Sequence, residues 1–237
     1  VYQDSFADSL ATGVVRYRNG TVEEFNTQNS NLSHNTVRSI FEDKFGNLWV
    51  GTYDKLNKLP PGQKKFTTLD LKGSYKSSLK NNLVVDIKPS ILSDSVLWVG
   101  TETGLCALNI FTGKFSHYSE RNAAFSNEVV KNIYTASNGN LWLGTDFGLN
   151  IFDSRTNTNK ALFHNPQLSY SIANNVISQI YEDAGGVLWF VTSNGLSRLS
   201  KPGNYYTYHP VSHEFNGQTI GNQVKSALIT SNGITWL

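Results

Sequence analysis

The chain has 237 residues with a formal net charge of +2, and 39% of the residues are hydrophobic and 16% charged. A chain of this size can bury one large core or a row of small ones. The balanced charge, without a basic stripe, excludes a nucleic-acid-binding domain, and the single cysteine, Cys106, excludes an internal disulfide.

The five tryptophans mark an internal repeat of about 47 residues. They are Trp49, Trp98, Trp142, Trp189 and Trp236, separated by 49, 44, 47 and 47 residues, and we number the repeats 1 to 5 in this order. The segment around each tryptophan reads Leu-Trp-Val-Gly-Thr in repeats 1 and 2, Leu-Trp-Leu-Gly-Thr in repeat 3 and Leu-Trp-Phe-Val-Thr in repeat 4. Such a recurrence indicates that one structural module is repeated along the chain.

The first predicted strand of each repeat carries two apolar residues three positions apart. These pairs are Val37/Ile40, Val84/Ile87, Val130/Ile133, Ile177/Ile180 and Val224/Ala227. A turn follows, such as Asp43 to Asn47 in repeat 1, and its glycine supplies the positive φ that a tight hairpin requires. The Trp segment is the second predicted strand, so the two strands form a hairpin.

The third predicted strand begins at a Gly-Leu step, and the fourth carries aromatic residues. The Gly-Leu steps are Gly104-Leu105, Gly148-Leu149 and Gly195-Leu196, and repeat 1 departs from the pattern with Lys55-Leu56. The aromatic residues are Phe66, Phe115, Tyr118, Phe163, Tyr205 and Tyr208. Before repeat 1, the segments 13–17 and 21–25 match a third and a fourth strand, whereas repeat 5 ends after its second strand.

A single four-stranded sheet of this size cannot bury both of its faces, but radial stacking of several sheets can. We therefore predict an all-β fold, a β-propeller of four-stranded antiparallel blades, with four complete blades and two half blades. The predicted limits are a partial blade 1–34, blades at about 35–81, 82–127, 128–174 and 175–221, and a partial blade 222–237. The two halves either form one closing blade or have neighbours in further sequence, and we expect the chain to be part of a longer protein.

Several residues that invite a chemical role have a structural interpretation at their repeat positions. A tryptophan at the same place in every repeat is expected between blades rather than under a sugar. Glu42-Asp43 and Glu182-Asp183 resemble the carboxylate pairs of glycosidases, but each stands at a hairpin entry, where aspartate caps a turn. Asp153 to Asn159 lacks the glycine and glutamate of a calcium loop, and Cys106 fits a buried strand position.

The five histidines, His34, His117, His164, His209 and His213, occupy unrelated repeat positions. Without a cysteine or a carboxylate cluster beside them, they do not predict a metal site. The sequence therefore predicts no catalytic residue, no metal and no cofactor in this segment.

Ligand-binding residues are expected where the repeats differ although their scaffold recurs. The loop between the second and third strands of each repeat, called the 2–3 loop below, is such a place. Its candidate ligand-binding residues are Tyr53, Asp54, Lys55, Glu102, Asp146, Phe147 and Asn194. They combine aromatic rings with carboxylates, an amine and an amide, as sugar-binding sites do.

The composite motif Asn-x-Val-x-x-Ile, turn, Leu-Trp-Val-Gly-Thr resembles the regulator-propeller repeats of hybrid two-component sensors. It is carried here by Asn35, Val37, Ile40 and Leu48 to Thr52, and by their counterparts in the other repeats. The resemblance covers nearly the whole chain.

This resemblance implies a periplasmic sensor region of a membrane-spanning histidine kinase that works as a homodimer. Many members of the family respond to oligosaccharides and switch on genes for polysaccharide use. By resemblance, this segment binds an oligosaccharide or another small ligand, meets the membrane only through flanking segments and catalyses nothing. Two alternatives stay open: a propeller enzyme similar to streptogramin lyase, and a spacer that only holds the dimer geometry.

Overall fold

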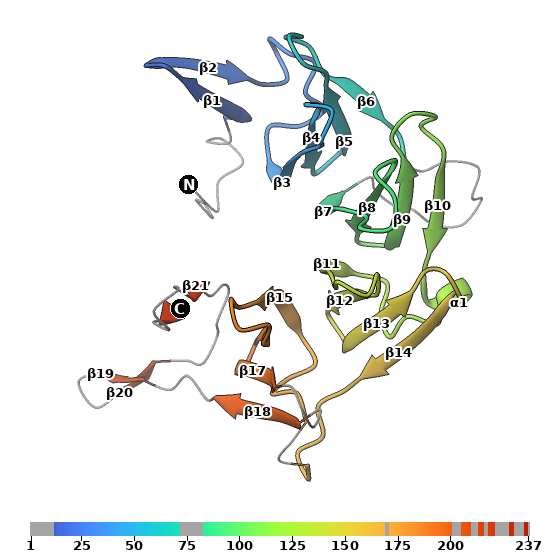
Figure 1. Cartoon of the computed structure of the whole chain (residues 1–237). Helices are drawn as coiled ribbons and strands as arrows, with labels where there is room; N and C mark the ends of the chain where they lie inside the picture. Colours follow the sequence, from blue (N-terminus) through green and yellow to red (C-terminus); the bar gives the residue numbers. More distant parts are fainter. Residues whose placement is uncertain are drawn as a thin grey trace. The chain divides into compact units, whose positions relative to one another are not determined.

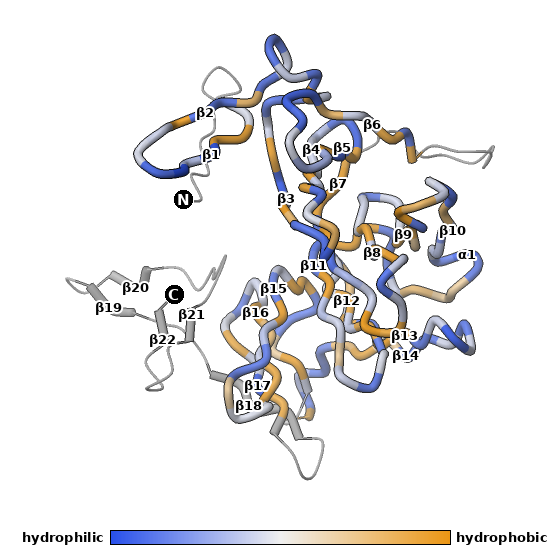
Figure 2. The backbone as a smooth tube through the Cα atoms, turned by 45° about the horizontal axis from the view of Figure 1, so that its top comes forward, coloured by the Kyte–Doolittle hydropathy of each residue, from blue (hydrophilic) through white to orange (hydrophobic). Residues whose placement is uncertain are grey.

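The computed structural model describes residues 12–71, 83–168 and 171–200, and beyond them only the backbone of a few short strands. Figure 1 shows that the regular secondary structure of the described chain consists of strands and one short helix, joined by loops. The chain forms two compact units, residues 1–117 and 118–237. In Figure 2 the hydrophobic stretches fall mainly in strands, and the hydrophilic ones mainly in the turns that join them.

The first unit contains one strand pair and two four-stranded sheets. The pair is β1 (Val14–Arg18) with β2 (Thr21–Phe25). The sheet of repeat 1 is β3 (Val37–Glu42), β4 (Leu48–Thr52), β5 (Lys55–Leu59) and β6 (Thr67–Leu69). The sheet of repeat 2 is β7 (Val84–Pro89), β8 (Val96–Thr101), β9 (Gly104–Asn109) and β10 (Phe115–Tyr118).

The second unit begins with a short helix and contains two further four-stranded sheets. The helix is α1 (Glu120–Ala123). The sheet of repeat 3 is β11 (Val130–Thr135), β12 (Leu141–Thr145), β13 (Leu149–Asp153) and β14 (Thr158–Leu162). The sheet of repeat 4 is β15 (Ile177–Glu182), β16 (Leu188–Thr192), β17 (Gly195–Ser200) and β18 (Tyr205–His209). Two strand pairs follow, β19 (His213–Phe215) with β20 (Gln218–Ile220) and β21 (Leu228–Ile229) with β22 (Thr235–Trp236).

Within each four-stranded sheet the strands lie in chain order and pair antiparallel, so the strand with the apolar pair is at one edge and the Trp strand beside it. The predicted all-β class, four complete blades and two half blades are thus confirmed. The residue limits of the blades stay a prediction, and Val224 and Ala227 lie outside the described residues.

One strand pair and one helix were not predicted from the sequence. The β19–β20 pair lies in the connection between repeats 4 and 5. Helix α1 lies between repeats 2 and 3, where Ser119 caps its first turn and Asn122 bonds back to the Ser119 backbone. A four-residue helix produces no hydrophobic periodicity, so only this capping box could have indicated it.

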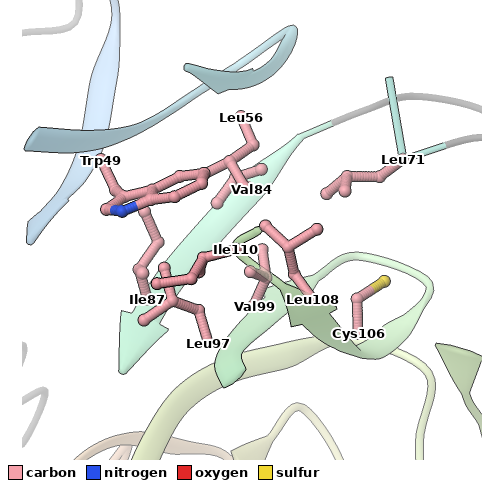
Figure 3. Close-up of a cluster of buried hydrophobic side chains, with 10 residues drawn as sticks. All are labelled: Trp49, Leu56, Leu71, Val84, Ile87, Leu97, Val99, Cys106, Leu108 and Ile110. Carbon is pink, nitrogen blue, oxygen red and sulfur yellow. The ribbon is translucent and has the colours of Figure 1, made fainter. Parts of the chain in front are cut away.

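The tryptophan of one repeat packs on the sheet of the next. Trp49 is 1% exposed and belongs to one buried cluster with residues of β7 and β8, and Figure 3 shows its indole beside Val84 and Ile87. In the second unit, the ring of Trp142 lies 5.7 Å from that of Phe190 in the next sheet. The predicted position of the tryptophans between blades is confirmed for these two residues.

The glycine of the Trp strand, two residues after the tryptophan, allows the next sheet to approach. A Cβ on Gly51 would lie 2.5 Å from Val84 Cγ1, and one on Gly144 would lie 3.0 Å from the Ile177 carbonyl oxygen. The contact at Gly51 is closer than real Cβ atoms show, and the one at Gly144 is tighter than nearly all of them. A side chain at either position would therefore require the next sheet to shift.

In each unit, two neighbouring sheets are also joined by an equivalent hydrogen bond. The backbone N–H of Ile87 donates to Ser39 Oγ at 3.1 Å, and that of Ile180 donates to Asn132 Oδ1 at 2.9 Å. Both acceptors stand two residues after the first apolar residue of their edge strand, next to a register shift. The irregularity at this point turns a polar side chain toward the backbone of the next repeat.

Candidate functional site

The 2–3 loops have the same backbone support in all four repeats. Each loop follows a buried threonine whose hydroxyl donates to the carbonyl three residues later, over 2.7 to 3.1 Å. The same hydroxyl accepts the backbone N–H two residues later, over 3.1 to 3.2 Å. The threonines are Thr52, Thr101, Thr145 and Thr192. Because these bonds fix the turn, the loop residues can vary without changing its shape.

The connection that enters each repeat is held beside the 2–3 loop by a buried polar side chain of the third strand. This side chain accepts the backbone N–H of the residue 24 positions earlier, over 2.7 to 2.9 Å. The acceptors are Asn57, Asn150 and Ser197, and their donors are Ser33, Ser126 and Ala173. In repeat 2 the acceptor's place is taken by Cys106, which is buried as predicted. The connection that enters a repeat is called the entry loop below. In repeats 1, 3 and 4 these hydrogen bonds hold it beside the 2–3 loop.

In repeat 1, the Tyr53 ring is covered by side chains from two neighbouring segments. His34 of the entry loop stacks on it at 5.7 Å with an interplanar angle of 26°. The guanidinium of Arg38, from β3, lies 5.8 Å from the ring centre. Tyr53 remains 40% exposed. The sequence had not indicated His34 or Arg38 as its partners, because both contacts cross between segments.

Lys55 has a backbone conformation that is unusual for a residue with a side chain. Its φ is 140°, and the corresponding residues of the other repeats are Gly104, Gly148 and Gly195, with φ of 134°, 109° and 107°. Its ammonium lies 3.6 Å from the carboxylate of Asp54. A non-glycine residue retained at such a position marks a candidate functional site.

The other candidate residues lie in the same loop position of their own sheets. Glu102 is exposed in the loop between β8 and β9. Asp146 forms an ion pair with Lys131 of β11, and Phe147 is 53% exposed. The backbone N–H of Asn194 donates to Thr192, as the repeat requires. Tyr53 to Lys55 share one loop, Asp146 and Phe147 share another, and Glu102 and Asn194 each lie in a loop of their own.

Phe163 lies at a different place from the one that the sequence predicts. The sequence places it among the aromatic residues of the fourth strands, but β14 ends at Leu162 and the Phe163 ring lies 5.6 Å from that of Phe147. The signal for this contact is the position of Phe163, directly after the residue that pairs with Leu149 at the start of the third strand.

The carboxylates at the hairpin entries cap turns, as predicted. Asp43 Oδ1 accepts the backbone N–H groups of Phe45 and Asn47, and Asp183 Oδ1 accepts those of Gly185 and Val187. Burial opposes ionisation of Asp43, but hydrogen bonds from Trp49 and Asn47 outweigh it and lower its pKa. A hydrogen bond from Trp189 likewise lowers the pKa of Asp183. A glycosidase general acid needs a raised pKa, so neither aspartate fits that role.

The described histidines bond to loop backbone. His34 Nδ1 accepts the N–H of Thr36, and ring nitrogens of His117 and His164 lie 2.8 and 2.6 Å from the carbonyls of Thr103 and Ile172. Among the described residues, no three histidine, cysteine, aspartate or glutamate side chains lie close enough to hold a metal ion. Across the same part of the chain, no helix has the length and apolarity required to span a bilayer.

Three segments of the chain, residues 31–54, 124–147 and 171–194, match the family model of the two-component regulator propeller. These three segments are similar to two-component regulator propeller repeats. Each matched segment runs from the entry loop through the edge strand and the Trp strand and ends in the 2–3 loop. The regulator-propeller match therefore ends on the candidate residues Asp54, Phe147 and Asn194.

Solved structures share this fold. One is described as the extracellular domain of a putative one component system from B. thetaiotaomicron, with 20% identity, a TM-score of 0.67, and coverage of 95% of this chain and 36% of that one. Another, described as the extracellular domain of a putative hybrid two component system from the same organism, has 21% identity, a TM-score of 0.64 and the same coverage. Virginiamycin B lyase from Staphylococcus aureus has 14% identity and a TM-score of 0.55, over 85% of this chain and 69% of the lyase.

At these identities the likeness establishes the fold alone. The chain spans about a third of the length of the two extracellular domains. Among curated proteins, none matches this chain.

Proposed function

We propose that this chain is a ligand-sensing segment in the periplasmic part of a hybrid two-component sensor histidine kinase. In this proposal the ligand is an oligosaccharide, and binding regulates genes for polysaccharide use. The observation that carries the proposal is the set of three regulator-propeller segments. The description of one structural neighbour as the extracellular domain of a putative hybrid two component system supports the location outside the cytoplasm.

The 2–3 loops support ligand recognition because their backbone is constant and their side chains are not. Four buried threonines fix the turns in the same way. The side chains above them include a tyrosine, a phenylalanine, carboxylates and an amide. A rigid support with variable polar and aromatic groups lets a family of repeats recognise different sugars without changing its fold.

Signal transmission requires that the ligand stabilise one arrangement of the sensor over another. Within each unit, adjacent sheets are joined by a tryptophan that packs on the next sheet and by the Ser39–Ile87 or Asn132–Ile180 hydrogen bond. Such contacts resist small independent movements of one sheet, because packed interfaces are not continuously deformable. In the proposal, ligand binding favours one of two arrangements of the sensor dimer, and this difference crosses the membrane.

Calorimetry of the intact protein with a panel of oligosaccharides tests the proposal. We expect saturable binding of at least one oligosaccharide, and expression of a reporter gene for polysaccharide use in response to the same compound. Chromatography of each incubation tests the enzyme alternative, because a lyase or hydrolase would release shorter products. Absence of binding across the panel would contradict oligosaccharide sensing.

A further inference from the structure

Phe147 and Phe163 form a pair of exposed aromatic rings in repeat 3. Their ring centres lie 5.6 Å apart with an interplanar angle of 51°, and the two side chains are 53% and 45% exposed. Phe147 belongs to the loop between β12 and β13, and Phe163 follows β14. The pair therefore lies at the end of the sheet that carries the candidate ligand loops.

The fold of the repeat does not require aromatic residues at these two positions. The residue that corresponds to Phe147 is Asp54 in repeat 1, Thr103 in repeat 2 and Asn194 in repeat 4. The strand register aligns Phe163 with Asp70, since Leu162 pairs with Leu149 as Leu69 pairs with Leu56. Other repeats thus build the same turn with polar residues, and a large apolar side chain exposed to water has an energetic cost.

The two rings are held in place by contacts and hydrogen bonds of the loop backbone. Phe147 N–H donates to Thr145 Oγ1 at 3.1 Å. A Cβ on Gly148 would lie 2.9 Å from Phe163 Cε1, so the Phe163 ring rests against the glycine backbone. Asn175 accepts the N–H of Gly148 with its carbonyl and that of His164 with its side chain, both at 2.7 Å. These bonds fix the residues that follow each ring, so the pair is preorganised.

The charges beside the pair are balanced. Asp146, directly before Phe147, forms an ion pair with Lys131. The two phenylalanine rings therefore offer an apolar surface with polar groups at its rim, and the Asp146–Lys131 ion pair adds no net charge to it. Aromatic faces carry partial negative charge, which suits the polarised C–H groups on the apolar face of a pyranose.

We propose that Phe147 and Phe163 form a stacking platform for an uncharged sugar ring of the ligand. This inference rests on the proposed function and assigns Phe163 as a binding residue that the sequence did not indicate. A protein partner fits less well, because two half-exposed phenylalanines offer roughly 200 Å², whereas a stable interface covers about 800 Å² on each partner.

The experiment compares alanine variants at this pair with variants at a second exposed pair. Phe45 and Phe111 are 44% and 66% exposed, and their rings lie 5.1 Å apart. They lie in a first hairpin and in a turn between third and fourth strands, at the opposite end of their sheets from the 2–3 loops. The intact protein and its Phe147→Ala, Phe163→Ala, Phe45→Ala and Phe111→Ala variants are titrated calorimetrically. The probes are neutral cello-, xylo- and malto-oligosaccharides and acidic oligogalacturonates.

We expect a neutral probe to bind, with Kd raised about tenfold by Phe147→Ala and by Phe163→Ala, which corresponds to about 1.4 kcal/mol, and unchanged by the two control substitutions. The variants Phe147→Leu and Phe163→Leu retain apolar volume without a ring, so they show the same loss even if an alanine variant unfolds.

Each other result overturns the inference in a recognisable way. If a neutral probe binds but the substitutions at Phe147 and Phe163 leave Kd unchanged, the proposed function stands and the platform does not. Binding of acidic probes alone overturns the assignment of an uncharged ring. If no probe binds, oligosaccharide sensing itself fails, and the platform fails with it.

Discussion

The indole Nε1 of Trp49 donates a hydrogen bond to Asp43 Oδ2 over 2.8 Å, and the ammonium of Lys58 lies 5.1 Å from the centre of the same ring system. Trp189 has the same surroundings, with Asp183 Oδ2 at 2.9 Å and the Arg198 guanidinium at 5.6 Å. In both repeats the tryptophan thus contacts one acidic and one basic side chain.

The aspartate and the basic residue beside the tryptophan occur in the same two repeats, 1 and 4. The strand register places Ala107 opposite Trp98 and Ile151 opposite Trp142, where repeats 1 and 4 have Lys58 and Arg198. The hairpin entries of repeats 2 and 3 begin with Ser90 and Ala136. The aspartate thus has two structural roles, because it caps the hairpin and fixes the edge of the indole, and the cation balances its charge near the ring.

Replacement of the acid should therefore destabilise the first unit. Asp43→Asn converts one carboxylate oxygen into a donor, which faces either the N–H groups of Phe45 and Asn47 in place of Oδ1 or that of Trp49 in place of Oδ2. We expect a loss of about 2 kcal/mol in the free energy of unfolding, measured by urea titration. Asp94→Asn is the control, because Asp94 is an exposed partner of Lys44, and its loss should stay within about 0.5 kcal/mol. Equal urea midpoints for the two variants would contradict the structural role of Asp43.

The lowered pKa values of Asp43 and Asp183 predict a loss of stability in acid. A carboxylate whose pKa is lower in the folded than in the unfolded state stabilises the fold above the unfolded value, here near 3.8, and loses this contribution as the pH falls through the folded value. The urea midpoint should therefore decrease below about pH 4. The double variant Asp43→Asn with Asp183→Asn should show a shallower decrease, and a decrease of the same steepness would exclude these two groups as its source.

The glycines that allow the sheets to approach should not tolerate a methyl group. At Gly51 the added carbon would lie 2.5 Å from Val84 Cγ1, and at Gly144 it would lie 3.0 Å from two atoms of Ile177. We expect Gly51→Ala and Gly144→Ala each to lower the free energy of unfolding by about 2 kcal/mol. Gly185→Ala is the comparison, because its Cβ would meet only a side-chain oxygen at 3.2 Å. Thermal unfolding of the three variants should rank Gly185→Ala as the mildest.

The strand order could be predicted from the sequence because it follows from a repeat that recurs four times. The hairpin cap at Asp43 and the close approach at Gly51 also follow from local rules, which act within one repeat or between identical ones. These rules need only the identity and spacing of residues.

The surroundings of Phe66 and Phe163 could not be predicted in this way. Both are aromatic residues near a fourth strand, yet Phe66 is buried against Phe25 and Phe163 is 45% exposed beside Phe147. The register is the same in both repeats, since Leu162 pairs with Leu149 as Leu69 pairs with Leu56. Phe66 therefore lies before its fourth strand and Phe163 after its own, at positions of the repeat that are not equivalent. Contacts across segments, such as His34 with Tyr53, depend on which residue stands at each such position and not on the repeat motif.

Cys106 should be inert toward thiol reagents in the folded protein. It is buried in the cluster around Trp49, and burial raises the pKa of its thiol to about 12. Since only the thiolate reacts, no modification by a maleimide is expected between pH 7 and 9 on the timescale of minutes. Labelling should appear only at urea concentrations that unfold the first unit. Rapid labelling without urea would show that the cluster opens locally.

Lys55 offers a test that separates backbone strain from function. Lys55→Gly should raise the free energy of unfolding by about 1 kcal/mol, because glycine adopts a φ of 140° without steric conflict. Lys55→Ala is the matched control, since it removes the same ammonium and the same contact with Asp54 but keeps a Cβ at the strained position. If the lysine is retained for ligand contact, both variants should weaken binding of the same oligosaccharide equally, although only the glycine variant gains stability. Equal stability of the two variants would show that the backbone at this position is not strained, and unchanged binding in both would remove Lys55 from the candidate site.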